Sequence, residues 1–520
     1  MRTILTGTLL FLLVSLSAQT TVYIDPSASA NGVGTITNPY NGSTFNVQYG
    51  QPWTSNTTYL FKRGTTFTPN YGIGIIAKND VFIGAYGVGL APKITSTSVP
   101  FDLGSSYNIT IRDLDVFGSN YNKTTEVGPL CLIKMNGSSP TGYNNMKILN
   151  CKLHGANWGI RAVVGVDQIK VDSCEIYNTL DDGMFYQGAT NCELANTYIH
   201  DVNEKWYNIQ TQEHAGGDCA QFDGNVKGLN GLYIHNNIMD HSSTGLKFCL
   251  IYEGIKAGDI IRIENNTFIR GTTAGPEQGL YISGEDHTTI FKNNTITNAG
   301  AIAYWSTAPQ TNSIFSGNTI TNAERGFELY QTNNVKVTGN YFNNTTTAIE
   351  HENHAYGLTV SGNTFNLISG QKICNLHASS GQTLAGITWG ANIYPSAVVT
   401  ATFGLTSYSL TNWLSYTGGT IETPPADTVI VTPPANDLCN IFCDTLKKLN
   451  AKITTYSNQV VNLTTVNTLL LNKEISYKDT INVVRISNNT LKNQMNIKSD
   501  SILLLKGIIY GVQNLTKPVK

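Results

Sequence analysis

Four charged residues in the middle of the chain are of types that could do chemistry together. Asp182, Asp218 and Asp223 fall side by side when the repeats described below are aligned, and Lys247 follows one repeat later. Three carboxylates this close repel one another unless a cation lies between them, and clusters of oxygen ligands suit Ca²⁺. Two carboxylates held apart can instead act as general acid and base in glycoside hydrolysis. A structural role competes with both, because Asp before a strand often caps backbone N–H groups.

Side chains of the kind that bind sugars lie close to these aspartates in the sequence. An insertion, VNEKWYNIQTQEHAGG, lengthens the repeat at this point, and insertions in repeat proteins form loops that often wall the binding face. Its Trp206 could stack on a sugar ring or could simply anchor the loop. The predicted substrate-binding residues are Gln221, Tyr281, His214, His241 and Trp206.

An internal repeat must hold these residues in place. The segments KNNTITNAG, SGNTITNAE, TGNYFNNTT and SGNTFNLIS recur with a period of about 22 to 24 residues. Short β-branched strands separated by Asn and Gly turns at this period predict a parallel β-helix, in which each coil stacks on the next. An antiparallel propeller would need a period nearer forty. The aligned positions are Cys151, Cys174, Asn196, Asn237, Asn266, Asn294, Asn318, Asn340 and Asn363.

The two cysteines at the start of this column, Cys151 and Cys174, occupy equivalent positions in adjacent coils. We therefore predict a buried ladder of cysteines, and a disulfide between them is the alternative.

A second repeated column predicts one side chain per coil on the outer face of a single sheet. In each coil a small residue is followed by an inward-facing apolar residue and then by an outward-facing residue. Neighbouring coils are roughly 4.8 Å apart, so the outward residues form one row. Glu328 and Glu350 have no insertion beside them, and we predict a solvated face there. The outward residues of this alignment are Arg161, Phe185, Gln221, Lys247, Tyr281, Glu328 and Glu350.

The composition of the chain excludes some classes of function. Of 520 residues, 33 are Lys or Arg and 35 are Asp or Glu, which is far from the basic excess used to bind nucleic acid or an anionic membrane. The 48 glycines and the mean hydropathy of -0.13 favour a β-rich chain with many turns. We therefore predict an all-β protein that does not bind nucleic acid.

Changes in composition divide the chain into four parts. Residues 1–18 have an early arginine, an apolar run and small residues, which predicts a cleaved signal peptide and a secreted or cell-surface protein of bacterial type. No later stretch is apolar for long enough to form a transmembrane anchor. Residues 19–420 contain the β-helix, and residues 421–437 are a Pro-rich linker. In residues 438–515, apolar side chains alternate at spacings of three and four, which predicts an α-helical coiled coil.

From about residue 21 to residue 415 the chain resembles the secreted right-handed parallel β-helix proteins of the pectate-lyase superfamily. Besides the repeats, the resemblance rests on VYIDPSASANGVGTITNPY followed by TYLFKRGTTF. It implies activity on a polysaccharide. The segments LDDG at 180–183 and GDC at 217–219 are similar to the Asp motifs of polygalacturonase-like hydrolases, although the GHG and RIK motifs of those enzymes are absent.

Polysaccharide lyases similar to chondroitinase B and alginate lyase use a Lys base and an Arg, often with Ca²⁺. The resemblance implies that Lys247 is the base, whereas Tyr281 stands at the position of the Arg. We predict a lyase that cleaves a uronic-acid polymer by β-elimination, with Lys247, Asp182 and Asp218 catalytic and Ca²⁺ held by Asp182, Asp218 and Asp223. A hydrolase with paired Asp residues and a non-catalytic glycan-binding adhesin or tailspike-like protein are the alternatives.

The heptad pattern of residues 438–515 generates a prediction about assembly. A single helix would expose its apolar seam to water, so we expect two or three chains to associate through this segment. Light scattering of the full chain and of a chain truncated after Thr423 should show fewer chains per particle for the truncated form. Equal numbers would mean that the segment folds back on its own chain.

Overall fold

The computed structural model describes most of residues 20–421. The predicted signal peptide and coiled coil lie outside the described residues, as does the linker except for Ile421. No helix within the described part of the chain is both long and apolar enough to span a membrane. The gaps inside this part are residues 47–51, 71, 126, 137–144, 164, 203–216, 225–226, 243–247, 272–278, 300–302, 305–308, 354, 378–385 and 396–398.

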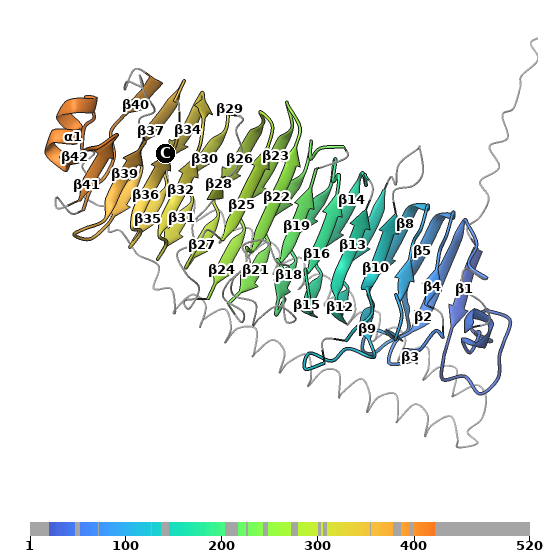
Figure 1. Cartoon of the computed structure of the whole chain (residues 1–520). Helices are drawn as coiled ribbons and strands as arrows, with labels where there is room; N and C mark the ends of the chain where they lie inside the picture. Colours follow the sequence, from blue (N-terminus) through green and yellow to red (C-terminus); the bar gives the residue numbers. More distant parts are fainter. Residues whose placement is uncertain are drawn as a thin grey trace, which may run out of the picture. The chain divides into compact units, whose positions relative to one another are not determined.

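The described strands form long parallel sheets that run along the stack of coils (Figure 1). One coil contributes a strand to each of three sheets in turn, and each strand pairs in parallel with the equivalent strand one coil away. The 14-stranded sheet contains β1 (Thr20–Ile24), β2 (Thr57–Lys62), β5 (Asn79–Tyr86), β8 (Tyr107–Arg112), β11 (Met146–Leu149), β14 (Ile169–Asp172), β17 (Glu193–Ala195), β20 (Tyr233–His235), β23 (Ile260–Glu264), β26 (Thr288–Lys292), β30 (Ile314–Ser316), β34 (Val335–Thr338), β37 (Leu358–Ser361) and β40 (Ile387–Trp389).

The second and third sheets complete each coil. The 12-stranded sheet contains β3 (Thr66–Phe67), β6 (Lys93–Ser96), β9 (Asp115–Gly118), β12 (Lys152–Ala156), β15 (Glu175–Thr179), β18 (Tyr198–His200), β21 (Ile238–His241), β24 (Thr267–Arg270), β27 (Thr295–Thr297), β31 (Thr319–Thr321), β35 (Tyr341–Asn343) and β38 (Thr364–Asn366). The nine-stranded sheet contains β4 (Ile73–Gly74), β7 (Phe101–Asp102), β10 (Cys131–Asn136), β13 (Trp158–Val163), β16 (Met184–Gln187), β19 (Ala220–Asp223), β22 (Leu250–Ile255), β25 (Leu280–Gly284) and β28 (Ala303–Tyr304).

A five-stranded sheet continues the nine-stranded sheet, because its first strand lies beside β28. The last two strands of the five-stranded sheet pair antiparallel and end the repeat. A short two-stranded sheet pairs β29 (Gln310–Thr311) with β33 (Thr332–Asn333). The five strands are β32 (Arg325–Leu329), β36 (Thr347–His351), β39 (Lys372–Leu376), β41 (Thr400–Phe403) and β42 (Thr406–Ser409).

Strand alternation builds one continuous core from the inward residues of every coil. In the 14-stranded sheet these residues are register partners of one another and all are buried, so each coil covers the apolar side chain of the previous one. The prediction of an all-β parallel helix is therefore confirmed. Part of this column is Ile148, Val171, Leu194, Ile234, Ile263, Phe291 and Phe315.

Helix α1 (Leu410–Thr417) follows the last strand and covers the end of this core. Ser409 accepts a hydrogen bond from Asn412 N–H at the start of the helix, and Gly418 adopts the left-handed conformation at its end (φ 70°). Trp413 is fully buried and meets Trp389 edge to face, with ring centroids 5.3 Å apart. The short 3₁₀ helix η1 (Ser43–Asn46) lies near the other end.

The asparagine column forms a buried ladder at the corner between the 14-stranded and 12-stranded sheets. Asn318 donates from Nδ2 to Phe291 O (3.0 Å) and Asn340 Oδ1 (2.9 Å). Its own Oδ1 accepts from the backbone N–H (2.9 Å) and Nδ2 (3.1 Å) of Asn294. The same pattern links Asn237, Asn266, Asn294, Asn318, Asn340, Asn363 and Asn392.

The first coils use other residues at this corner. Thr197, and not Asn196, occupies the column position, because Asn196 takes the left-handed conformation of the preceding turn residue (φ 49°). Thr197 N–H donates to Asn237 Oδ1 (2.9 Å), and Thr197 Oγ1 accepts from Cys174 N–H (3.3 Å). Cys151 and Cys174 continue the column as free buried thiols, which confirms the predicted cysteine ladder.

Removing one side chain from this ladder should destabilise the β-helix. Asn318→Ala leaves the backbone N–H of Asn294 and the carbonyl of Phe291 without their buried partner, and each such group costs about 1–3 kcal/mol. We expect a loss of roughly 2–4 kcal/mol in urea unfolding. Thr319→Ala, on the outer face of the next strand, is the matched control and should change stability by less than about 0.5 kcal/mol. Equal losses for both variants would contradict this role of the ladder.

Candidate functional site

The outer face of the nine-stranded sheet carries the predicted row of side chains, with one correction. Strand register places Phe185 beside Gln221, Gln221 beside Ile251, and Ile251 beside Tyr281. The prediction that Lys247 occupies this row is wrong, because Ile251 does. Lys247 lies outside the described residues.

The register differs from the prediction because the small residue before strand β22 is Cys249, and not Gly245. Cys219 and Cys249 occupy the same column, since Ala220 N–H donates to Cys249 O and Cys249 N–H donates to Gly279 O. Both thiols are fully buried, as the position requires. Leu250 therefore faces the core, where the alignment expected Leu246.

Asp182 is buried and holds backbone in place. It is 4% exposed, and its Oδ1 accepts from the N–H groups of Gly217 (3.1 Å) and Asp218 (2.8 Å) in the next coil. Its Oδ2 accepts from Trp158 Nε1 (3.1 Å). Burial, and then the charge of Asp181, raise the pKa of Asp182 to about 7. These contacts support the structural role considered from the sequence, in which the Asp182 side chain caps backbone N–H groups.

The three predicted metal ligands differ in their surroundings. Asp218 is 4% exposed before strand β19, whereas Asp223 is half-buried on the outer face of that strand. Among the described residues, the group whose possible ligand atoms converge within 4.8 Å is Glu350, Glu352 and His377, not these aspartates. Ca²⁺ binding by the aspartates stays a prediction.

The predicted substrate-binding residues separate into three groups. Gln221 is half-buried on the outer face and donates from Nε2 to Glu253 Oε1 (3.1 Å). Tyr281 lies on the same face, 7% exposed, in an apolar cluster with Phe248 and Ile251. His214 and Trp206 lie outside the described residues.

His241 faces the interior, so the prediction that it contacts substrate is not supported by its position. It is fully buried, and its Nε2 lies 2.7 Å from the carbonyl oxygen of Gly217. Burial lowers the pKa of His241 to about 4, so the imidazole is neutral at pH 7 and donates this hydrogen bond. Asp182 and His241 thus bond to the N–H and to the carbonyl oxygen of the same residue, Gly217.

A pair of carboxylates that the sequence analysis only half identified lies on the outer face. Asp223 and Glu253 are register partners on β19 and β22, and both are half-buried. Gln187 is the partner of Asp223 on the preceding strand. The alignment did not identify Glu253, because it placed the outward residue of this coil at Lys247, four residues before Ile251. The motif YEG after an apolar run would have revealed it once Cys249 was aligned with Cys219.

Farther along the same face, the predicted solvated cluster is in fact packed. Glu328 and Glu350 are register partners and are 9% and 6% exposed. Arg325 lies between them, with Nη1 2.9 Å from Glu328 Oε2 and Nε 3.2 Å from Glu350 Oε2. His377 Nε2 is 2.8 Å from Glu350 Oε1. Because these charges pair both within strand β32 and across coils, they are buried where the sequence alone predicted exposure.

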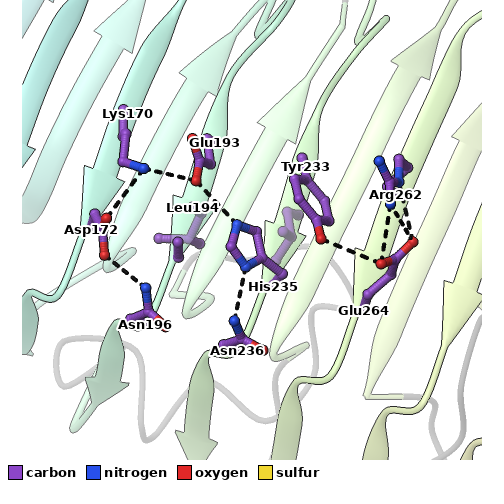
Figure 2. Close-up of polar contacts among 12 residues, drawn as sticks. Lys170, Asp172, Glu193, Leu194, Asn196, Tyr233, His235, Asn236, Arg262 and Glu264 are labelled. Atoms are coloured by element: carbon purple, nitrogen blue, oxygen red, sulfur yellow. Dashed lines mark hydrogen bonds and ion pairs between the residues drawn. The ribbon is translucent and has the colours of Figure 1, made fainter. Parts of the chain in front are cut away.

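The outer face of the 14-stranded sheet carries a charged network that pairs internally (Figure 2). Lys170 Nζ lies 2.9 Å from Glu193 Oε1 and 3.2 Å from Asp172 Oδ2. His235 Nε2 lies 3.1 Å from the same Glu193 oxygen, and Arg262 is paired with Glu264 at 3.0 Å. Such partly exposed pairs contribute little each, and the charged groups of this network already pair with one another.

The outer face of the 12-stranded sheet carries a stack of rings. Phe117, His154, Tyr177 and His200 lie in successive coils with centroids 4.8, 4.6 and 5.1 Å apart and nearly parallel planes. Their faces cover one another, whereas sugar stacking needs an open ring face. We therefore assign this stack to coil packing, and the outer face of the nine-stranded sheet is the candidate site.

Comparison with known proteins agrees with this architecture. Residues 131–312 match the sequence model of the right handed beta helix region family. A search of curated protein sequences found no match. The fold of the described residues is that of a right-handed parallel β-helix.

Solved structures with a similar fold include several enzymes that act on polysaccharides. The catalytic unit of a GH87 α-1,3-glucanase from Streptomyces thermodiastaticus is 14% identical, with a TM-score of 0.38 over 77% of this chain and 69% of that one. A mannuronic acid specific family 6 polysaccharide lyase from human gut microbiota is 12% identical (TM-score 0.36; 78% and 92% covered). An alginate lyase complex is 12% identical (TM-score 0.42; 79% and 98% covered). At these identities the likeness concerns the fold alone.

The raised pKa of Asp182 predicts a pH-dependent stability. A carboxyl whose pKa is higher in the folded chain than in the unfolded chain stabilises the fold while protonated. This contribution is complete below about pH 4, and it is lost as the pH rises towards 7. Asp182→Asn should therefore reduce the fall in melting temperature between pH 4 and pH 7, measured by circular dichroism. An unchanged slope would show that Asp182 is ionised in the folded chain across this range.

Proposed function

We propose that the chain is a carbohydrate-active enzyme that binds a polysaccharide along the outer face of the nine-stranded sheet. The face carries polar side chains that can hydrogen-bond hydroxyl groups, and the partly exposed ring of Phe185 can pack against a sugar, whereas Ile251 and Tyr281 are buried with Phe248. It carries one or two such side chains per coil, so an extended polymer can lie across the coils. The outward residues are Arg161, Phe185, Gln187, Gln221, Asp223, Ile251, Glu253 and Tyr281.

The observation that carries the proposal is the register of Asp223 and Glu253 on adjacent strands. Neighbouring parallel strands are about 4.8 Å apart, and two carboxyl groups about 5 Å apart suit glycoside hydrolysis with retention of configuration. One carboxylate attacks the anomeric carbon while the other protonates the leaving oxygen. The second group then removes a proton from the water that releases the product.

The contact of Gln221 with Glu253 supports Glu253 as the carboxylate that reacts in its ionised form. The Nε2–H of Gln221 donates to Glu253 Oε1, and a donor on this oxygen favours the ionised form of the carboxyl. We therefore assign Glu253 as the nucleophile and Asp223 as the general acid and base. Asp182 and His241 act from beneath, where they hold Gly217 and so position the start of β19.

The β-elimination alternative depends on Lys247. This residue precedes β22 in the sequence, in the connection that leads onto the same face. As a base it would abstract the proton α to a uronate carboxylate, and Ca²⁺ would stabilise the resulting charge. Secretion through residues 1–18, self-association through residues 438–515 and a purely adhesive role remain predictions from the sequence.

Substitution of the carboxylates tests the proposal. Asp223→Asn and Glu253→Gln should each lower the rate of polysaccharide cleavage by about 10² to 10⁴. Asp240→Asn, on the outer face of the 12-stranded sheet, is the matched control and should retain activity. A panel of neutral and uronic-acid polymers should be assayed both for reducing ends and for absorbance at about 232 nm, where unsaturated uronates absorb.

The two readouts separate the alternatives. Reducing ends without absorbance, lost in both variants, support hydrolysis by Asp223 and Glu253. Absorbance that disappears with Lys247→Ala but survives Glu253→Gln would establish the lyase instead. Binding of a polymer without cleavage by the intact chain would leave the adhesive role.

A further inference from the structure

The five-stranded sheet carries a second group of chemically active side chains, separate from the Asp223 and Glu253 pair. Glu350 projects from β36, Glu352 follows two residues later, and His377 follows β39 in the next coil. The backbone N–H of His377 donates to the carbonyl of His351 (2.8 Å), so His377 is held beside Glu352. Sequence distance hid this proximity, because 25 residues separate Glu352 from His377.

The possible ligand atoms of these three side chains converge. One atom each from Glu350, Glu352 and His377 lies within 4.8 Å of the others. The closest approach is 2.8 Å, between His377 Nε2 and Glu350 Oε1. Glu350 is buried, Glu352 is half-buried, and the His377 side chain is 50% exposed. The group therefore has a fixed base and an open side towards solvent.

Asn375 lies beside the same groups. Its Nδ2 lies 3.1 Å from Glu350 Oε1 and 3.0 Å from His377 Nε2. Glu350 Oε1 accepts from the amide and also faces His377 Nε2 at 2.8 Å. With the amide turned, Asn375 Oδ1 can face a cation held between the imidazole nitrogen and the carboxylates, as a fourth possible ligand.

The charge of the surroundings also favours a dication. Glu328, Glu350 and Glu352 carry three negative charges, and Arg325, paired with the first two, returns one positive charge. Together these four side chains carry a net charge of −2, without counting His377. An imidazole nitrogen with two carboxylates is the donor set of borderline divalent metals such as Zn²⁺, whereas Ca²⁺ prefers oxygen ligands alone.

We propose that Glu350, Glu352 and His377 bind a divalent transition metal of the Zn²⁺ class, one ion per chain. The exposed side of His377 leaves a coordination position open to water or to an anionic ligand. The inference does not depend on the proposed hydrolase activity, since β36 and β39 are separated from β19 and β22 by strands β25, β28 and β32. Arg325 pairs with Glu350 Oε2, the oxygen that does not face His377. Its positive charge repels any cation beyond the first.

Isothermal titration of the untagged full chain, stripped with a chelator, tests the site with Zn²⁺ as the probe. His377→Ala and Glu352→Gln should each weaken binding by about tenfold or more, because the first removes a ligand and the second removes the negative charge of a ligand. Zn²⁺ should raise the melting temperature of the wild-type chain and shift it less in either variant. Both substituted side chains are at least partly exposed, so the metal-free melting temperatures should agree and show that the variants fold.

His235→Ala is the matched control. His235 also pairs with one glutamate, at 3.1 Å, but Lys170 stands where a second carboxylate would be needed. This variant should bind Zn²⁺ as the wild type does. The proposal fails if the wild-type chain binds no Zn²⁺, or if His377→Ala and Glu352→Gln bind it as tightly as His235→Ala does.

Discussion

Everything on the surface of this protein depends on the buried hydrogen-bond ladder at the corner between the 14-stranded and 12-stranded sheets. From β8 to β38, two residues separate the strands that meet there in every coil. The first commonly takes the left-handed conformation, and the second is the ladder residue, whose side chain bonds to the next coil. Because a one-residue slip would turn every inward side chain outwards, this corner fixes the register of each coil on its neighbour.

At the corner between the 12-stranded and nine-stranded sheets, the connections between the described strands differ in length. The connection from β15 to β16 spans residues 180–183, whereas the one from β18 to β19 spans residues 201–219. Longer connections are tolerated because the ladder has already set the register before the chain reaches them. The connections from the 12-stranded to the nine-stranded sheet lead onto the face that carries Asp223 and Glu253, so the fold permits change beside the candidate site without loss of the core.

Burial separates carboxyl groups of the same type into different roles. Asp182 is enclosed and accepts three N–H groups, so it organises the backbone of the next coil. Asp223, only 41 residues later in sequence, stands on the outer face beside Glu253 and can meet a substrate. Glu350 is intermediate, since it is buried but is matched by Arg325 and His377. Position on the strand, rather than residue type, decides which of these groups can do chemistry.

The sequence by itself determined the parallel β-helix, the period of its coils, the asparagine column and the alternation of inward and outward side chains. These features are local, because each coil repeats the same turn and the same strand pattern. Only the tertiary structure decided which residues meet across the long connections. It placed Ile251 where the alignment had placed Lys247, because the length of the connection before β22 cannot be derived from the repeat period. It also buried His241 and Glu350, whose partners Gly217, Arg325 and His377 are brought close by stacking of the coils and not by sequence spacing.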